Sequence, residues 1–514
     1  MDNILNIIKN KQLTHEQKVT SLSREAENTL DVLHLSPEIK EFMDKDIICD
    51  LFEGNAPYRP RYILPDYEKF MKQGSAFLKL NAPTKLYEAV NNLLILYKHT
   101  PSITNFPVFL GEIDKLLEPF IDDEKEAYQI IKLFLTHIDR TLTDSFVHAN
   151  IGPEQTKAGM LILKAEAELV NSIPNLTLKY SEKTSDTFAL EAIKTGLTAA
   201  KPYFANHNMF VNDFGVNYGI ASCYNGLPTG GGAYTLSRIN LKNLSFESSS
   251  IEDFLNTILP KGVTLMCEMM DKRIQFLVNE SGFFESNFLI EEGLALKERF
   301  TAMFGIHGLA ECVNHLIKAN QLKEKFGHNK MADDLGLQII KRLEKEVNKH
   351  NNSHCKISDN KFLLHAQCGI GTDVCTTPGC RIPVGEEPEL LDQIMQAAQL
   401  QKYFPAGTSD IFTFDDMAQK NPQFVLDIIK GAMKADLRMF SFYTKNNDLI
   451  RITGYLVKRS EMEKYKNGER VLHDTVELGV TSSESFNIDD RKLIESEKEK
   501  DTSAKGCLES LTKA

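Results

Sequence analysis

Residues 451–457 read RITGYLV, and this short stretch decides how the rest of the chain is interpreted. Gly454 lies at its centre. Because glycine has no Cβ, its α-carbon can become planar without steric strain, and its backbone can adopt φ values that other residues avoid. Loss of an α-hydrogen there would leave an unpaired electron shared between the two flanking amide groups. The stretch therefore indicates a candidate backbone radical site at Gly454.

The same region also fits an ordinary β-hairpin. Residues 439–444 (MFSFYT) and 449–457 (LIRITGYLV) flank the polar residues 445–448, as two strands joined by a turn would. A glycine inside a strand commonly marks only a bulge or a close backbone approach. The motif alone leaves both interpretations open.

A second informative stretch surrounds Cys223. Asn225, Gly226, Pro228 and a run of three glycines at 230–232 follow this cysteine closely, which predicts a loop. A reactive thiol at a loop tip is one interpretation. The other is a small buried side chain, which is the commonest role of a cysteine outside disulfides.

Four segments together carry a resemblance to the glycyl radical enzymes. In chain order they are 174–180 (PNLTLKY), Cys223 with its glycines and the following TLSRINL, 404–412 (FPAGTSDIF), and 451–457. Thr453 stands where that family usually has Ser, Cys or Ala. The chain length and the stretches RITGYLVKR and GCRIPVGEEP resemble the short YjjI group of these enzymes most.

The resemblance implies a function for both candidate residues. A radical stored on Gly454 would pass to the sulfur of Cys223, and the resulting thiyl radical would abstract hydrogen from an unidentified small-molecule substrate. The glycyl radical would be the only cofactor, with no bound organic cofactor and no metal. The chain has no CxxxCxxC motif for an iron–sulfur cluster, so a separate radical S-adenosylmethionine activating enzyme is the implied partner.

Differences from known glycyl radical enzymes limit the reactions that this chain could catalyse. Cys223 lies between Ser222 and Tyr224, so the adjacent cysteine pair of pyruvate formate-lyases is missing, and Asn225 occupies the position where related dehydratases carry a glutamate base. No cysteine occurs between 381 and 454, where anaerobic ribonucleotide reductases carry zinc ligands. Two alternatives remain: activity like that of those reductases, or a non-catalytic metal-binding or interaction protein that keeps the fold, for which Thr453 is the best argument.

The resemblance and the hydrophobic periodicity together predict the architecture. We expect a mainly helical region over 1–170, an α/β barrel carrying the thiyl cysteine loop over 171–435, a glycyl radical domain over 436–488 and a polar tail over 489–514. The barrel implied by the resemblance has ten strands in two antiparallel halves. Apolar spacing also predicts one long amphipathic helix over 296–320.

Composition excludes several classes of protein. A net charge of −12 argues against nucleic-acid binding, because a protein that binds nucleic acid needs a basic patch on its surface. There is no apolar run near 18 residues and no signal-peptide pattern, so we expect a soluble, cytoplasmic protein. A homodimer is compatible with the sequence.

The other chemically interesting residues give weaker signals. Nine cysteines at irregular spacing in a chain without an export signal indicate reduced thiols. Cys355, Cys368, Cys375 and Cys380 lack the CxxC spacing of structural zinc sites. Cys312 has apolar neighbours typical of a core position.

Candidates for a general base are few. His307 and Glu311 are four residues apart in the expected helix and would share one face, where a solvated or capping role is the ordinary alternative to substrate contact. Glu386 and Glu387 lie in a turn-rich stretch, CTTPGCRIPVGEEP, that we expect near the active site.

Overall fold

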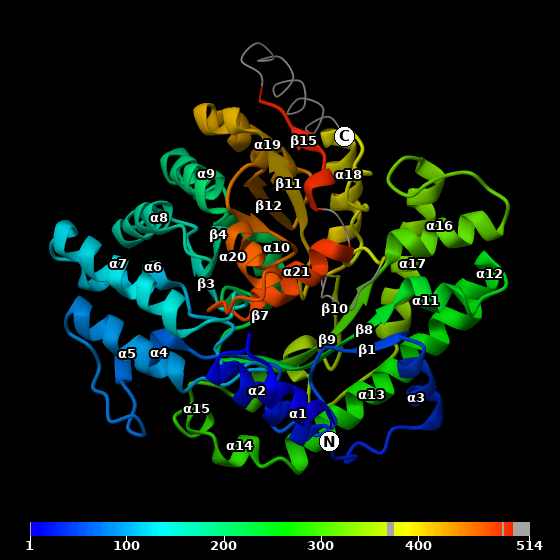
Figure 1. The fold of residues 1–514 in the computed structure, drawn as a ribbon, viewed down its shortest axis with the longest axis horizontal. Coiled ribbons are helices and arrows are strands. Elements are labelled where there is room, and N and C mark those ends of the chain that lie inside the picture. The colour runs from blue at the N-terminus through cyan, green and yellow to red at the C-terminus, as the bar shows by residue number, and fades with distance from the viewer. Residues whose placement is uncertain (1, 367–374, 486–487, 497–514) are drawn as a thin grey trace.

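Two β-sheets organise the chain, with helices packed around them and two short β-hairpins beside them (Figure 1). The computed structural model describes residues 2–366, 375–485 and 488–496. The expected α/β architecture is present. None of the helices in these ranges is long and apolar enough to cross a membrane.

The first sheet has five strands built around β8 (Gly231–Asn240). β9 (Phe300–His307) and β10 (Leu363–His365) follow β8 in parallel, whereas β1 (Ile48–Asp50) and β2 (Tyr62–Leu64) pair with β8 in antiparallel fashion. All ten residues of β8 are buried. Burial on both faces is typical of parallel strands covered by helices.

The second sheet has six strands in the order β15-β11-β12-β5-β4-β3. Two parallel groups meet where β12 pairs with β5 in antiparallel fashion. The strands are β3 (His148–Ile151), β4 (Asn175–Tyr180), β5 (Tyr203–Asn206), β11 (Asp410–Phe414), β12 (Met439–Thr444) and β15 (Leu493–Ile494).

A single parallel bridge between Ala366 and Thr408 links the end of β10 to the start of β11. It connects the two sheets, so that β8, β9, β10, β11 and β12 all run in one direction. Within the described residues the pairings form two sheets and do not close into one ten-stranded barrel. The mixed α/β class is therefore observed, and barrel closure is not.

Amphipathic helices cover the sheets. α9 and α19 pack on β12, and α13 packs on β8 (Figure 1). The principal covering helices are α7 (Glu124–Thr141), α8 (Lys157–Leu169), α9 (Asp186–Ala199), α11 (Leu241–Ser245), α13 (Leu259–Asn279), α16 (Leu309–Ala319), α17 (Lys330–Val347), α18 (Leu390–Gln401) and α19 (Pro422–Lys434). The short helices elsewhere in the chain are α10 (His207–Phe214), α12 (Ile251–Asp253), α14 (Phe283–Ser286) and α15 (Phe288–Glu291).

The single helix expected over 296–320 is wrong. Residues 300–307 form the strand β9, and α16 begins only after Gly308, whose φ of +75° ends the strand. The run FTAMFGIH is apolar on both faces because it is a central strand, and such a run cannot be told from a buried helix by periodicity. His307 and Glu311 consequently lie on different elements and share no helix face.

The N-terminal region is mainly helical, as its periodicity predicts, but it is not separate from the sheets. β1 and β2 join the first sheet and β3 joins the second. These strands have three or four residues each, which is too short for a periodic pattern to reveal. The remaining helices of this region are α1 (Asp2–Lys9), α2 (His15–Glu27), α3 (Pro37–Asp44), α4 (Tyr67–Gln73), α5 (Leu86–Lys98) and α6 (Ile113–Leu117).

The C-terminal segment packs in a small hydrophobic cluster that it shares with Ala199, Ala200, Ile411 and Tyr443. A hairpin of β13 (Leu449–Arg451) and β14 (Leu456–Lys458) packs with α20 (Arg459–Lys466) and α21 (Thr475–Ser485). The hairpin expected between 439–444 and 449–457 is wrong, because β12 pairs with β5 and β11 instead. Of the expected polar tail, β15 pairs with β11, and residues 497–514 lie outside the described ranges.

Candidate active site

Cys223 lies at the tip of a short hairpin. β6 (Tyr218–Ala221) and β7 (Asn225–Pro228) pair in antiparallel fashion, and Ala221 opposite Asn225 is the last pair before the turn. Ser222 has a φ of +56°, which places it in the left-handed region and sharpens the turn. The side chain of Cys223 is buried, with 9% of its surface exposed.

Gly454 lies at the tip of the β13–β14 hairpin, directly against Cys223. A Cβ added to Gly454 would lie 2.0 Å from the Cβ of Cys223 and 2.6 Å from its sulfur. No side chain fits in that space, so the close approach of the two loops requires glycine. The structure thus brings together the two residues that the sequence motifs single out, although 231 positions separate them along the chain (454 − 223).

Hydrogen bonds fix the Gly454 hairpin against the sheet. Asn175 Nδ2 donates to the carbonyl oxygen of Gly454 over 2.6 Å, and Tyr224 donates its hydroxyl to the carbonyl of Thr453 over 2.8 Å. The guanidinium of Arg451 donates to the carbonyl of Ala200 over 2.7 Å. Because these partners come from β4, the Cys223 loop and the segment before β5, the β13–β14 hairpin is held on several sides.

The Cys223 loop is anchored in the same way. Tyr203 donates its hydroxyl to the carbonyl of Cys223, and His148 Nδ1 lies 2.7 Å from the carbonyl of Ser222. Burial lowers the pKa of His148 to about 3, so the ring is neutral and its Nδ1–H donates to that carbonyl. Rigid support of this kind holds the thiol in one place.

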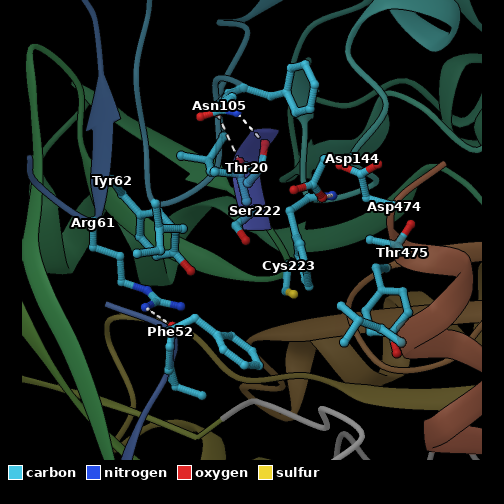
Figure 2. Close-up of a pocket in the computed structure, with 18 of the residues that line it drawn as sticks. Thr20, Phe52, Arg61, Tyr62, Asn105, Asp144, Ser222, Cys223, Asp474 and Thr475 are labelled. Atoms are coloured by element: carbon cyan, nitrogen blue, oxygen red, sulfur yellow. Dashed lines mark hydrogen bonds between the residues drawn. The ribbon is translucent and has the colours of Figure 1, made fainter. Parts of the chain in front are cut away.

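A cavity of about 230 Å³ opens beside Cys223. In Figure 2 Cys223 lies between Arg61 and Tyr62 on one side and Asp144, Asp474 and Thr475 on the other. The lining comes from α2, the loop at 103–108, the Cys223 hairpin, β10 and α21. The cavity is therefore enclosed by elements from both ends of the chain.

Polar groups from distant parts of the chain meet in this cavity. Asn105 Nδ2 donates to the hydroxyl of Thr20 over 2.6 Å, and Gln17 Nε2 donates to Asp474 over 2.8 Å. Burial and the nearby Asp144 raise the pKa of Asp474 to about 7. A small polar molecule would find hydrogen-bonding partners here as well as apolar walls.

One member of the lining is a histidine that the sequence did not single out as a site residue. His365 ends β10, and its Nε2 lies 2.6 Å from the side-chain oxygen of Asn225. Asn225 occupies the position at which related dehydratases carry a glutamate base. Here its side chain binds the imidazole of His365 at the cavity wall. No sequence signal connects the two residues, because 140 positions separate them.

The weaker candidates lie elsewhere. His307 is buried beside Cys49, with 3.8 Å between its Nε2 and the cysteine sulfur, and Glu311 accepts hydrogen bonds from the backbone and hydroxyl of Thr377. Glu311 thus binds the loop at Thr377, a role that is neither solvated nor capping. Neither residue lines the cavity at Cys223.

The two glutamates of the turn-rich stretch are also away from the thiol. Glu386 pairs with Lys325 over 2.8 Å, and Glu387 accepts hydrogen bonds from the backbone of Gly385 and Lys492. Neither of them lines the cavity at Cys223. Their hydrogen bonds and ion pairs stabilise the local loop.

The remaining cysteines give no metal site among the described residues. Cys312 is a buried core residue of α16, and burial raises the pKa of its thiol. Cys375 is exposed, Cys355 and Cys380 are buried, and Cys368 lies outside the described ranges. In those ranges no three His, Cys, Asp or Glu side chains converge as metal ligands would.

Known proteins resemble this chain along almost its whole length. Residues 13–494 match the family described as glycyl radical enzyme YjjI-like. The chain belongs to this family. A Haemophilus influenzae protein is 46% identical over 500 residues, which cover 96% of this chain and 97% of that protein. The Escherichia coli protein YjjI is 41% identical over 494 residues, which cover 95% and 94%.

Solved structures with the same fold are much more distant in sequence. The anaerobic ribonucleotide reductase of Thermotoga maritima matches with a TM-score of 0.66 at 11% identity, over 90% of this chain and 92% of that one. The B12-independent glycerol dehydratase of Clostridium butyricum matches with a TM-score of 0.67 at 13% identity, over 96% and 88%. Such matches show that the mixed α/β fold is that of glycyl radical enzymes.

Proposed function

We propose that this protein is an enzyme that stores a radical on Gly454 and uses Cys223 as its thiyl radical. The contact between the two residues carries the proposal, since only a glycine fits where Gly454 meets the Cys223 side chain. Both residues are buried, which suits a radical that must be kept from water and oxygen. Membership of the YjjI-like family supports the same conclusion.

The proposed chemistry consists of two hydrogen-atom transfers. In the first, the α-carbon radical of Gly454 takes the hydrogen of the Cys223 thiol, so that a C–H bond forms and the S–H bond breaks. In the second, the thiyl sulfur takes a hydrogen atom from a carbon of a small molecule in the cavity. An S–H bond forms, a C–H bond of the substrate breaks, and the unpaired electron moves to the substrate.

Two further elements belong to the proposal. The run of five parallel strands from β8 to β12, joined to β5 in antiparallel fashion, supports closure into the ten-stranded barrel implied by the resemblance. The radical itself would come from a separate radical S-adenosylmethionine enzyme, because the chain has no cluster-binding motif. That enzyme must reach Gly454, which is buried in the present arrangement.

The non-catalytic alternative rests on Thr453. This residue is buried in the radical hairpin, and its carbonyl accepts the hydrogen bond of Tyr224. The hydrogen bond uses the backbone, so threonine is compatible with the hairpin geometry. We therefore favour a catalytic protein over one that has the same fold but catalyses no reaction.

The test compares the protein with three variants after anaerobic activation. The wild-type protein should give the electron paramagnetic resonance doublet of a single α-hydrogen and consume a small molecule from a deproteinised cell extract, followed by mass spectrometry. Cys223→Ala should keep the doublet and consume nothing, whereas Gly454→Ala should lose both. Cys312→Ala, a buried cysteine away from the cavity, should keep both.

The contrary result is equally specific. A wild-type protein that gives no doublet with a competent activating enzyme overturns the proposal. So does a Cys223→Ala variant that consumes the same molecule as the wild-type protein.

A further inference from the structure

His365 lines the active-site cavity and has one unused ring nitrogen. Its side chain is 1% exposed and lines the same cavity as Cys223. Within the described part of the chain, Nε2 contacts Asn225, but the buried Nδ1 has no hydrogen-bond partner. Buried polar atoms in proteins nearly always have partners, and an exception at a cavity wall points to a ligand.

Asn225 determines which nitrogen carries the proton. The side-chain oxygen of Asn225 can only accept, so the Nε2 that lies 2.6 Å from it must donate. Burial and the nearby Arg61 and Arg238 lower the pKa of His365 to about 3, which keeps the ring neutral. A neutral ring that carries its hydrogen on Nε2 has a lone pair on Nδ1, and Nδ1 is therefore a hydrogen-bond acceptor.

We infer that His365 Nδ1 accepts a hydrogen bond from a hydroxyl group of the substrate and holds that group beside Cys223. The inference rests on the proposed function and adds a substrate class to it. An acceptor needs a donor, and the donors of small metabolites are hydroxyl and amino groups. The guanidinium groups of Arg61 and Arg238 lower the pKa of this ring, and the same positive charges disfavour an ammonium ion beside it. The hydroxyl group of an alcohol remains as the donor.

Asn225 is then a positioning residue that acts through His365. A carboxylate in its place would stabilise the protonated ring, and a protonated Nδ1 would donate instead of accept. The neutral amide keeps the acceptor form. This gives a physical reason for asparagine at a position where a catalytic glutamate would be charged.

The first experiment measures binding of a minimal alcohol to the full-length protein without activation. Saturation-transfer NMR should detect ethylene glycol on the wild-type protein, and its dimethyl ether, which has no donor, should give no signal. Loss of one buried hydrogen bond should weaken ethylene glycol binding about tenfold in His365→Phe. His307→Phe is the matched control, since this buried histidine ends the neighbouring strand β9 outside the cavity, and it should bind as the wild type does.

A second measurement does not depend on how the His365→Phe variant folds. In wild-type protein labelled with ¹⁵N in the histidine rings, the shift of His365 Nδ1 should be that of an unprotonated nitrogen, and it should change when ethylene glycol is added. In Asn225→Asp the same nitrogen should become protonated at a higher pH than in the wild type.

The outcomes separate this inference from the proposed function. The inference is wrong if ethylene glycol binds equally well to His365→Phe and to the wild type, or does not bind to the wild type. The radical chemistry still stands in either case if the activated wild-type protein gives the doublet and consumes a small molecule. A protonated Nδ1 in the wild-type protein also overturns the inference. A missing doublet in the wild-type protein instead removes the proposed function.

Discussion

Gly454 is constrained by packing as well as by the radical chemistry that we propose for it. Its α-carbon faces Cys223 so closely that an added Cβ would overlap the cysteine side chain at 2.0 Å. Neither neighbour can move freely, because Asn175 holds the carbonyl of Gly454 and Tyr203 holds that of Cys223. A methyl group here must push the two hairpins apart.

We therefore predict that Gly454→Ala lowers the free energy of unfolding by about 1–3 kcal/mol, the usual cost of overpacking a core. Denaturant titration of the protein before activation measures it. Gly262→Ala in α13 is the matched control, because its added methyl would meet only the ends of two side chains, Leu244 at 3.1 Å and Ile239 at 3.6 Å. A Gly454→Ala protein as stable as the wild type would contradict the packing described above.

Asp474 should make stability depend on pH. Its folded pKa is raised to about 7, whereas an unfolded aspartate titrates near its ordinary value of about 3.9. Between these values the folded protein binds the additional proton, so stability falls as the pH rises through this window. Asp474→Asn should reduce the fall in the denaturant midpoint between about pH 5 and about pH 8. An unchanged pH profile in that variant would show that Asp474 is ionised in the folded state.

The sequence singled out Cys223 and Gly454, which the structure places in contact, but not their surroundings. Cys223 and Gly454 stand in local motifs, and a motif is visible without knowledge of the fold. His365, Asn225 and Asp474 form their contacts only across the folded chain, and none of them stands in a motif that names its partner. Long-range contacts of this kind cannot be predicted from spacing.

At the level of elements, α2 and the residues just before it contact the C-terminal segment as well as the cavity. Gln17 donates to Asp474 and Gln12 donates to the carbonyl of Tyr465 over 3.0 Å. The segment of β13, β14, α20 and α21 packs in a small hydrophobic cluster that also contains Ala199, Ala200, Ile411 and Tyr443 and is separate from the main core. A segment outside the main core that is held partly by polar side-chain contacts can open locally without global unfolding.

We predict that Gln12→Ala combined with Gln17→Ala loosens this segment. Loss of two hydrogen bonds, each stabilising by about 0.5–1.5 kcal/mol, should speed amide hydrogen exchange over residues 449–485 about tenfold. Activation at Gly454 should become faster, because the activating enzyme needs access to that residue. Glu16→Ala, an exposed change in α2, is the control. Exchange that stays as slow as that of β8 and β9 would show that the segment does not separate.

Elements differ in how well their sequence predicts them. α7, α8, α17 and α19 are amphipathic over three turns or more, and each forms where the periodicity indicates. β9 is buried on both faces and has no polar side to mark it as a strand, so it was mistaken for part of a helix. The strands β1, β2 and β3 are too short to form a pattern.

For the whole molecule, the position of Gly454 predicts how oxygen damages the activated protein. A glycyl radical that reacts with oxygen breaks the backbone at its own position. Air added after activation should therefore split the chain at Gly454 into a long N-terminal and a short C-terminal fragment, detectable by mass spectrometry. The Gly454→Ala protein should remain intact under the same treatment, and cleavage at another glycine would place the radical elsewhere.

The contact between Gln17 and Asp474 also has a consequence for biosynthesis. The two residues are 457 positions apart. A ribosome that adds about 5–20 residues per second needs roughly 20–90 s to reach the second after making the first. Throughout that time Gln17 of α2 has no Asp474 to bind. The helix made among the first elements of the chain therefore reaches its final position only when translation is nearly complete, and a truncated chain without the radical hairpin would leave the wall of the cavity open.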